Sequence, residues 1–468
     1  MNKILYSLAL ILVLGTGCSS VKSAQSTNSG KIKKEVSKDE SSVVYNPETK
    51  KYEKVADKPT DTILPPATKK DTVMKKEVIV KKDTQLVMPN KTLLSSNLRE
   101  SNRKSTYNVS LVLPFNTGDS QNSSTNLSRN SVWAVHFYSG AKLALKKFEN
   151  TGVKINLNVI DTKNLETSIS SLLNRPELLN ADLIIGPYSS SQAKILIDFV
   201  KDRKTTLVSP YTTSSNPTTA NPNYIQANPS IYRHFEALSK HIAANFSADQ
   251  IVFLTQNTES AKSRTQNFIN TLNSFLTPEA KSKIREIVLP DNFLLSSEVK
   301  LDSTVTRNNE TVFIVPSWDE RYVKDVLKKI ENGRDGVPVY VYGMPQWQNM
   351  DDLKYLMTNL NARISSNVLL NLNNSNVDKF RSEYFDTYAK MPDLEAFSGY
   401  DVTSYFFSRL VSQGDFFQKD SRSAEKELYT RFDIKPVMND QQPGIVDYFE
   451  NYGLQIIQIK GSGFDILD

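Results

Sequence analysis

The sequence predicts an α/β protein of two doubly wound parallel-sheet lobes, and two observations carry this prediction. In residues 182–217 two short apolar runs, 183–185 and 206–208, flank a stretch with apolar residues at helical spacing. This order indicates a strand–helix–strand crossover between parallel strands. The same alternation of apolar runs and amphipathic stretches begins again after residue 230 and predicts the second lobe.

The apolar pattern places the remaining elements in order. In the first half we expect strands at 109–114, 156–160, 183–185 and 206–208, and helices at 131–149, 168–179 and around 193–200. In the second half we expect helices at 231–245, 260–275 and 319–330, with strands at 250–254, 284–289, 311–315 and 338–342. Two further helices follow from residue 378, and the segment 444–458 holds two β-prone runs.

The first 17 residues have the composition of an export signal. Lys3 precedes the apolar run 4–14, and small residues at 15–17 lead to Cys18, the only cysteine. This arrangement resembles the lipobox of bacterial lipoproteins, although Gly15 stands where leucine is usual. The resemblance implies that Cys18 is lipidated, the alternative being an ordinary cleaved signal with a chance cysteine. A single cysteine also excludes an intramolecular disulfide.

Residues 18–106 are expected to be a lipidated cysteine followed by a disordered basic linker, with the folded domain at 107–468. Between residues 19 and 106 Lys and Arg outnumber Asp and Glu by about eight, whereas the rest is near neutral. A basic linker argues against nucleic-acid binding, which would need charge on a folded face. Contact between the linker and anionic headgroups or cell-wall polymer is an alternative use of this charge.

Hydroxyl groups follow both strands of the first crossover. Ser189, Ser190 and Ser191 follow the earlier strand, and Tyr211, Thr212 and Thr213 follow the later one. The carboxyl edge of an open parallel sheet is where ligands bind, and a helix N-terminus there favours an anion. We therefore expect a ligand carboxylate at these side chains. The alternatives are helix capping by the serines and a plain turn at 212–215.

The strands of the second lobe end in a different set of residues. Ser317, Trp318 and Asp319 follow one strand, and Trp347 follows the next. Two tryptophans at strand ends suggest an apolar or stacking wall for the ligand. Asp319 is either a ligand contact or the cap of the helix that begins there.

Three segments carry a resemblance to the type I periplasmic binding proteins, of which the branched-chain amino-acid receptors are familiar members. They read IGPYSSSQ, SPYTTSSNP and EYFDTYAKMPDLEAFSGYDVTSYF. The resemblance implies a hinged receptor with lobe 1 at about 107–228 plus 395–430 and lobe 2 at about 229–394 plus 431–468. In amino-acid receptors of this family the first lobe holds the ligand carboxylate, and an acid of the second lobe usually holds the ammonium. The loop at 343–349 contains no acid, which departs from that pattern.

Catalysis and metal binding have no support in the sequence. The three histidines, His136, His234 and His241, form no metal-ligand motif, and no nucleophile elbow, P-loop or dinucleotide fingerprint is present. We expect no enzyme activity and no cofactor.

Two functions remain open. The first is a lipid-anchored solute receptor that binds a small polar ligand, such as an amino acid or peptide, for an ABC permease or for sensing. The second is an interaction lipoprotein similar to the penicillin-binding-protein activators, which acts on a peptidoglycan synthase and needs no small ligand. The long linker and the Asn/Ser-rich loop at 115–130 favour the second, and the strand-end hydroxyls favour the first. For both we expect the envelope of a Gram-negative bacterium, at the outer membrane facing the periplasm.

Overall fold

The computed structural model describes residues 43–46, 51–54, 97–117, 129–163, 166–290, 293, 301, 304–305, 310–420, 424–461 and 463–467. The expected signal segment 1–17, Cys18 and most of the expected linker lie outside these residues. The chain forms two compact units, Met1–Glu77 and Val78–Asp468. In the first unit β1 (Val43–Asn46) pairs antiparallel with β2 (Lys51–Lys54). The second unit contains both lobes.

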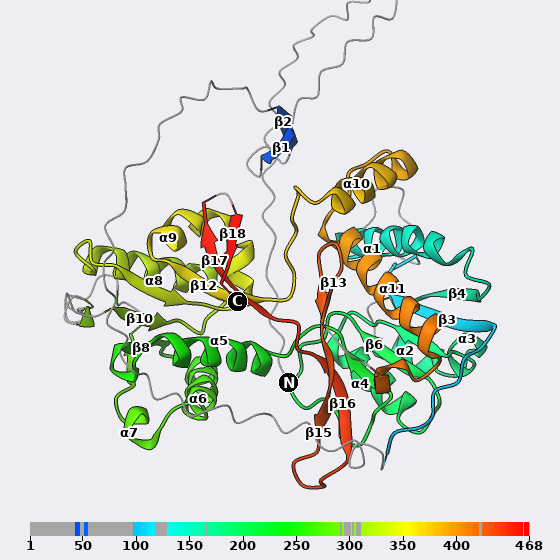
Figure 1. Ribbon diagram of the computed structural model, residues 1–468, viewed down its shortest axis with the longest axis horizontal. Coiled ribbons are helices and arrows are strands. Elements are labelled where there is room, and N and C mark those ends of the chain that lie inside the picture. The colour runs from blue at the N-terminus through cyan, green and yellow to red at the C-terminus, as the bar shows by residue number, and fades with distance from the viewer. Residues whose placement is uncertain are drawn as a thin grey trace, which may run out of the picture. The chain divides into compact units, whose positions relative to one another are not determined.

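Lobe 1 is built on a seven-stranded sheet of order β15-β16-β7-β6-β5-β3-β4, parallel except for the pair β15–β16. Its strands are β3 (Thr106–Leu113), β4 (Lys154–Asp161), β5 (Leu183–Ile185), β6 (Thr206–Ser209), β7 (Tyr224–Gln226), β15 (Ile434–Met438) and β16 (Val446–Asn451). Its helices are α1 (Arg129–Leu145), α2 (Glu166–Leu172), α3 (Pro176–Leu179), α4 (Ser190–Val200), α10 (Ser375–Tyr388) and α11 (Leu394–Gln413). The right-hand half of Figure 1 shows this lobe.

Alternation along the strands of lobe 1 divides its core into two layers. Leu183 and Ile185 of β5 face the cluster that contains residues of α1 and α11, whereas Ile184 faces the cluster that contains residues of α3 and α4. All three side chains are buried. A run that is apolar at every position therefore predicts a strand covered by helices on both faces, as the sequence indicated.

Lobe 2 has a second seven-stranded sheet, of order β18-β17-β12-β11-β10-β8-β9, parallel from β12 to β9 and antiparallel at β17 and β18. Its strands are β8 (Ile251–Gln256), β9 (Arg285–Leu289), β10 (Thr311–Ile314), β11 (Val339–Tyr342), β12 (Ala362–Ser366), β17 (Gln455–Lys460) and β18 (Gly463–Ile466). Its α-helices are α5 (Ile231–Asn245), α6 (Glu259–Asn273), α7 (Pro278–Lys281), α8 (Glu320–Gly333) and α9 (Lys354–Asn359). The expected two-lobed α/β fold is confirmed.

The boundary between the lobes differs from the one expected. Strands β15 and β16, expected in lobe 2, belong to the lobe 1 sheet, and only β17 and β18 of the segment 431–468 join lobe 2. Helix α10, also expected in lobe 2, shares a buried cluster with α1 and α11 of lobe 1. Strand pairing decides the membership of β15 and β16, and it joins residues as distant as Phe449 and Ile225, whereas packing decides that of α10. The expected helix at 168–179 is two short helices, α2 and α3.

Three chain crossings connect the lobes. They lie at 227–230, 367–374 and 452–454, between the strands and helices of the two sheets. The side-chain amide of Asn451, the last residue of β16, donates to the carbonyl of Ala227 at 2.9 Å, which ties the first crossing to the strand that leads into the third. The buried carboxylate of Glu450 in lobe 1 accepts from Arg233 Nε of lobe 2 at 3.0 Å and from the backbone N–H of Ser230 at 2.8 Å. These contacts hold the first crossing and the start of α5 against β16.

A carboxyl group also anchors the β13–β14 hairpin, formed by β13 (Glu425–Lys426) and β14 (Arg431–Phe432), beside the second crossing. Asp401 of α11 accepts hydrogen bonds from the backbone N–H groups of Leu428, Tyr429 and Thr430 at 3.1, 2.8 and 2.7 Å. Burial raises the pKa of Asp401 to about 7, against the effect of those three donors.

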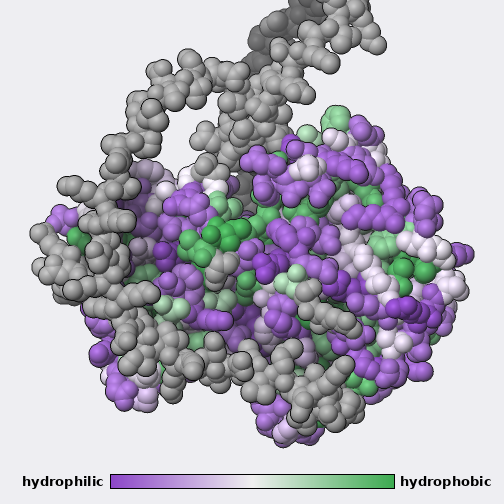
Figure 2. Space-filling view, viewed as in Figure 1, coloured by the Kyte–Doolittle hydropathy of each residue, from purple (hydrophilic) through white to green (hydrophobic). Residues whose placement is uncertain are grey.

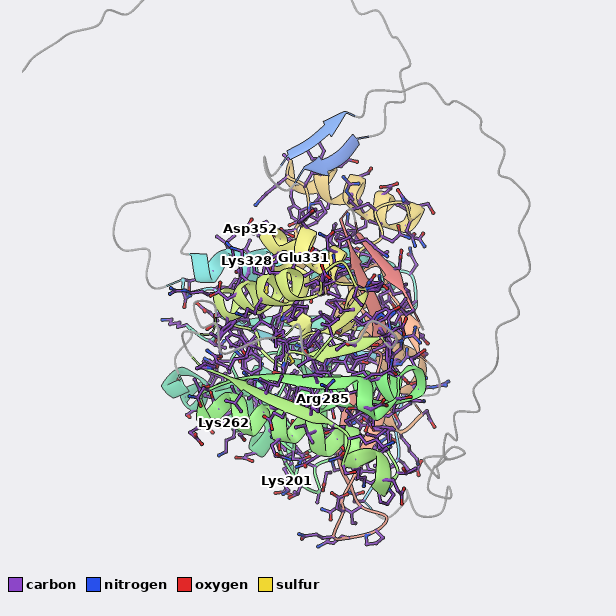
Figure 3. The ribbon with its side chains drawn as sticks, turned by 90° about the vertical axis from the view of Figure 1, so that its left-hand side faces the viewer. Lys201, Lys262, Arg285, Lys328, Glu331 and Asp352 are labelled. Carbon is purple, nitrogen blue, oxygen red and sulfur yellow. The ribbon has the colours of Figure 1, made fainter. Side chains whose placement is uncertain are left out.

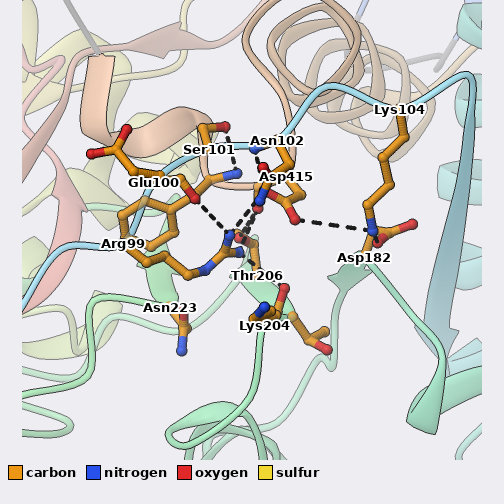
Figure 4. A network of polar contacts seen from close by, with 12 residues as sticks. Arg99, Glu100, Ser101, Asn102, Lys104, Asp182, Lys204, Thr206, Asn223 and Asp415 are labelled. Carbon is orange, nitrogen blue, oxygen red and sulfur yellow. Dashed lines mark hydrogen bonds and ion pairs between the residues drawn. The ribbon is translucent and has the colours of Figure 1, made fainter.

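Residues 97–106, expected to be part of the disordered linker, are held against lobe 1 in this structure. Asp415, which follows α11, is buried and accepts from Arg99 Nη1 at 2.8 Å and from the backbone N–H of Asn102 at 2.9 Å. Lys104 pairs with Asp182 at 2.5 Å, and Figure 4 shows the whole network. Sequence reasoning missed this N-terminal strap (residues 97–106) because its polar composition resembles that of the linker before it.

The pH dependence of stability should report on His234, which is buried in lobe 2 with Nδ1 2.8 Å from Ser365 Oγ. Burial lowers the pKa of His234 from its ordinary value of 6.5 to about 4. The unfolded chain therefore takes up this proton first, and the stabilisation, complete above pH 6.5, is lost as the pH falls towards 4. A shift of this size corresponds to about 3 kcal/mol. Urea unfolding should show the difference between the wild type and His234→Gln shrinking by about that amount from pH 7 to pH 4.

Asp401 has a raised pKa and favours the folded state as the pH falls, which opposes the effect of His234. Asp401 is present in both proteins, so its contribution cancels when their free energies of unfolding are subtracted. A difference that is independent of pH would show that His234 titrates normally in the folded protein.

Candidate functional site

The N-terminus of α4 lies at the carboxyl edge of the lobe 1 sheet, directly after β5. Ser189 caps this helix, since its hydroxyl accepts a hydrogen bond from the backbone N–H of Gln192 at 3.3 Å. Ser190 and Ser191 are exposed at the first turn. The capping alternative therefore accounts for Ser189, and the other two hydroxyls face solvent at a helix N-terminus, where an anion is favoured.

The loop after β6 presents fewer hydroxyls than expected. The side chain of Thr212 is buried and is hydrogen bonded to Ser209 Oγ, so its hydroxyl is used within the lobe. Thr213 is exposed. Tyr211 is partly buried, and burial raises the pKa of its hydroxyl, which lies close to Ser398 of α11.

Three aromatic rings form a cluster at this edge of lobe 1, and sequence reasoning missed two of them. The ring of Trp133 lies 4.5 Å from that of Tyr188 and 5.2 Å from that of Tyr211, and the two tyrosine rings are 5.3 Å apart. Tyr188 remains 46% exposed, so the cluster presents an aromatic surface beside Ser190. The signal available in the sequence was that Trp133 lies near the start of the helix after the first strand, at the same edge of the sheet.

The acid at the end of β4 has a structural role. The carboxylate of Asp161 accepts from the backbone N–H groups of Asn116, Thr117 and Lys163 at 3.0, 2.8 and 3.0 Å. Burial raises its pKa, but these hydrogen bonds outweigh burial and the net effect lowers it. Asp161 thus fixes the start of the loop after β3. Residues 118–128, most of the loop expected at 115–130, lie outside the described residues.

A second acid, Glu395, stands in the first turn of α11 near the hydroxyls of Tyr211 and Tyr429. Burial, followed by the neighbouring charge of Asp393, raises the pKa of Glu395. Asp393 itself caps α11 and lies 2.9 Å from His136 Nδ1. This group of charges lies beside the aromatic cluster without forming part of it.

In lobe 2 the strand-end residues divide into exposed and buried ones. Trp318 is 47% exposed, whereas Trp347 is fully buried in the core, with its Nε1–H donating to the carbonyl of Ser317 at 2.7 Å. The Ser317 side chain is also buried, and its hydroxyl accepts from the N–H of Asp319 at 3.3 Å. Trp347 and Ser317 therefore support the loop, and Trp318 alone of the two tryptophans presents a surface.

Asp319 caps α8, as the alternative in the sequence analysis indicated. Its carboxylate accepts from the backbone N–H of Tyr322 at 3.0 Å. Asp319 is nevertheless exposed and borders a cavity of about 250 Å³ at the carboxyl ends of β8 and β9. The cavity is lined by Gln256, Leu289, Pro290, Phe293, Asp319, Arg321, Tyr322 and Asp325. Sequence reasoning did not indicate this cavity, because its walls come from three separate segments.

The histidines are used in packing and hydrogen bonding. His241 Nδ1 lies 2.8 Å from the hydroxyl of Tyr342, and His136 Nε2 lies 3.0 Å from Lys390 Nζ. In the part of the chain that the structure describes, no three His, Cys, Asp or Glu side chains are grouped to hold a metal ion. Within the same residues, no helix is long and apolar enough to cross a membrane. Figure 2 shows hydrophilic side chains over much of the visible described surface, interrupted by small apolar patches.

Comparison with known proteins supports the fold. A family model described as periplasmic binding protein matches residues 129–274. A search of curated proteins by sequence finds no match. Among solved structures, a protein described as a branched-chain amino acid ABC transporter from Rhodospirillum rubrum has a TM-score of 0.55 and 15% identity, covering 77% of this chain and 99% of its own.

Two other solved structures give the same result. A branched-chain amino acid ABC transporter periplasmic ligand-binding protein from Burkholderia xenovorans has a TM-score of 0.52 and 11% identity, covering 78% of this chain and 95% of its own. An ABC transporter substrate-binding protein from Desulfitobacterium hafniense has a TM-score of 0.52 and 12% identity, covering 77% of this chain and 100% of its own. The chain has the type I periplasmic-binding-protein fold, and the resemblance expected from the sequence is confirmed.

Proposed function

We propose that the protein is a non-catalytic solute receptor of the cell envelope that binds a small polar ligand between its lobes. One observation carries the proposal: the first turn of α4 exposes Ser190 and Ser191 at the carboxyl edge of lobe 1, beside the exposed ring of Tyr188. Hydroxyls at a helix N-terminus suit a ligand carboxylate, and the ring suits its apolar part. On lobe 2 the proposal assigns ligand contact to Trp318 and Asp319.

The protein's setting forms part of the same proposal. Lipidation at Cys18 would anchor the chain to a membrane, with the outer membrane as the expected site and the folded unit in the periplasm. Two solved proteins with this fold are described as branched-chain amino acid ABC transporter proteins. An ABC permease or a sensing partner is therefore the expected recipient of the ligand. The loop at 343–349 contains no acid that could hold a ligand ammonium. The ligand is therefore not restricted to α-amino acids.

A thermal unfolding assay tests the receptor function. The protein is heated in the presence of amino acids, short peptides and cell-wall fragments, and a bound ligand should raise the midpoint. Ser190→Tyr should abolish any such rise, since a bulky ring would fill the space above the first turn of α4. Ser412→Tyr is the matched control, because Ser412 is exposed near the end of α11 in the same lobe. An effective ligand whose shift survives Ser190→Tyr would contradict this position for the site.

One observation favours the second function, an interaction lipoprotein that acts on a peptidoglycan synthase without a small ligand. The ring of Tyr211 packs against Trp133 and Tyr188, and the hydroxyl of Thr212 is hydrogen bonded to Ser209. Side chains of the lobe itself therefore fill part of the expected carboxylate site. This function predicts no thermal shift with any compound, together with capture of a cell-wall synthase from envelope extracts.

A further inference from the structure

The carboxyl edge of lobe 2 carries a cation that the sequence did not single out. Arg264 of α6 extends to the loop after β10, where its Nε donates to the carbonyl of Pro316 at 2.5 Å. Its guanidinium carbon lies 3.9 Å from the ring centroid of Trp318, close enough for a cation–π contact. The exposed tryptophan of this edge therefore has an arginine stacked on it.

The charge of Arg264 is not balanced by an acid. Among the residues that the structure describes, no carboxylate lies within ion-pair distance of its guanidinium, and its only hydrogen bond runs from Nε to Pro316. The side chain is partly buried, and this burial lowers its pKa from the ordinary value. Burying a cation without a partner costs free energy, so a guanidinium kept in this state is typical of a site that receives an anion.

A buried hydroxyl beside Arg264 also lacks a partner. Tyr322 of α8 is 8% exposed, and within the described part of the chain its hydroxyl oxygen makes no hydrogen bond. The charge of Arg264 acts on this hydroxyl, which places the two groups near each other. Buried polar groups are nearly always paired in folded proteins, so an unpaired hydroxyl next to an unpaired cation points to a missing acceptor.

We propose that the carboxyl edge of lobe 2 binds a carboxylate of the ligand, with Arg264 as the main donor and Tyr322 as the second. The inference rests on the proposed receptor function, but for a ligand with a single carboxylate it moves that group from Ser190 and Ser191 of lobe 1 to lobe 2. It specifies the ligand as a small organic carboxylate with an apolar, preferably flat, body. Arg264 offers its two terminal nitrogens to the carboxylate, which suits bidentate binding. The exposed part of Trp318 contacts the apolar body.

The cavity next to Tyr322 supplies room for that body. Leu289, Pro290 and Phe293 form apolar walls in its volume of about 250 Å³. Asp319, Asp325 and Arg321 line the cavity as well, so its charged lining has one more acid than base and disfavours an anion there. The carboxylate is therefore assigned to the Arg264 side, and the uncharged part of the ligand to the cavity. Lobe 2 would thus hold the negative group of the ligand with a cation, whereas in amino-acid receptors an acid of the second lobe usually holds the ligand ammonium.

Calorimetric titration with three compounds of one shape tests the inference. Phenylacetate, phenylacetamide and 2-phenylethylamine carry the same ring with a negative, neutral or positive end group. The protein should bind phenylacetate, and it should bind the other two at least tenfold more weakly. Arg264→Gln should weaken phenylacetate binding at least tenfold, and Tyr322→Phe should weaken it severalfold. Lys262→Gln is the control on the same helix, since Lys262 pairs with Glu259 at 3.2 Å and lies at the surface (Figure 3).

The outcomes separate this inference from the proposed function. The absence of phenylacetate binding, equal binding of the amine, or full affinity in Arg264→Gln would each overturn the lobe 2 site. The receptor function would still stand if another compound raised the unfolding midpoint in a manner that depends on Ser190. If Arg264→Gln does not fold, as circular dichroism would show, Arg264→Lys replaces it. Lysine keeps the charge but loses the bidentate geometry, so a clear loss of affinity is still expected.

Discussion

Replacing Gly399 by alanine is expected to destabilise the protein by about 3 kcal/mol, because α11 and α1 cross at this residue with no room for a side chain. A Cβ atom at Gly399 would lie 1.9 Å from the carbonyl oxygen of Phe137, and one at Gly140 would lie 1.9 Å from that of Ala396. The two helices touch through backbone atoms, so neither can yield by a rotamer change. Urea unfolding measures the loss, and Gly140→Ala should give a loss of similar size.

The direction of the stability change distinguishes a crowded glycine from an uncrowded one. In a helix without such a contact, glycine to alanine stabilises by about 1 kcal/mol. Ser408→Ala on the exposed face of α11 is the matched control and should change stability by less than about 0.5 kcal/mol. A stabilised Gly399→Ala protein would mean that the helices are farther apart in solution than this crossing requires.

The second large effect concerns the N-terminal strap. Asp415→Ala should destabilise lobe 1 by about 3 kcal/mol, since it leaves the guanidinium of Arg99 without its carboxylate and the N–H of Asn102 without its acceptor. The buried position of Asp415, 2% exposed, is the reason for so large a value. Arg99 also lies 4.5 Å from the ring centroid of Phe416, so its loss of order would expose that ring.

Hydrogen exchange and urea unfolding together measure the consequence. In Asp415→Ala the amides of residues 97–106 should exchange faster than in the wild type. Glu100→Gln is the control from the same strap, because Glu100 pairs with Lys419 at the surface and is 88% exposed in its side chain. If both substitutions had the same small effect, the strap would contribute little to the stability of the folded unit.

The strap and the proposed ligand contacts lie at opposite edges of the lobe 1 sheet. Its contacts reach residues that precede β5 and β6, such as Asp182 and Lys204. These residues lie at the amino edge of the lobe 1 sheet, whereas Ser190 and Tyr188 lie at the carboxyl edge. The strap therefore lies at the sheet edge away from the proposed ligand contacts.

Local sequence signals predicted most of the elements but missed several strands, and three of these show the reason. Tyr224–Gln226 is too short to show a period, and the strand Ala362–Ser366 contains more polar than apolar residues. The strand Ile434–Met438 includes Pro436, which usually argues against a strand, but here it lies at the edge of the sheet. Each of these strands is specified by its partner strand more than by its own composition.

The two strand-end tryptophans show that local composition does not predict which site residues are exposed. Both Trp318 and Trp347 follow a buried strand of lobe 2, and nothing in their immediate composition separates them. The ring of Trp347 lies over Gly343, where a Cβ atom would come within 2.3 Å of it, so the chain turns back and buries the indole. Trp318 instead faces outward, and its ring is stacked with the guanidinium of Arg264, which lies 54 residues earlier in the sequence.

The sequence by itself determined the class of fold and the order of the main helices and strands, and it offered capping as one of two roles for Ser189 and Asp319. These depend on periodicity and on hydrogen bonds between residues a few positions apart, which a linear pattern records. Only the tertiary structure decided which lobe each C-terminal strand joins, which strand-end side chains remain exposed, and that Trp133, Tyr188 and Tyr211 meet. These depend on contacts between distant segments, whose free energy is shared by both partners and is visible in the local sequence of neither.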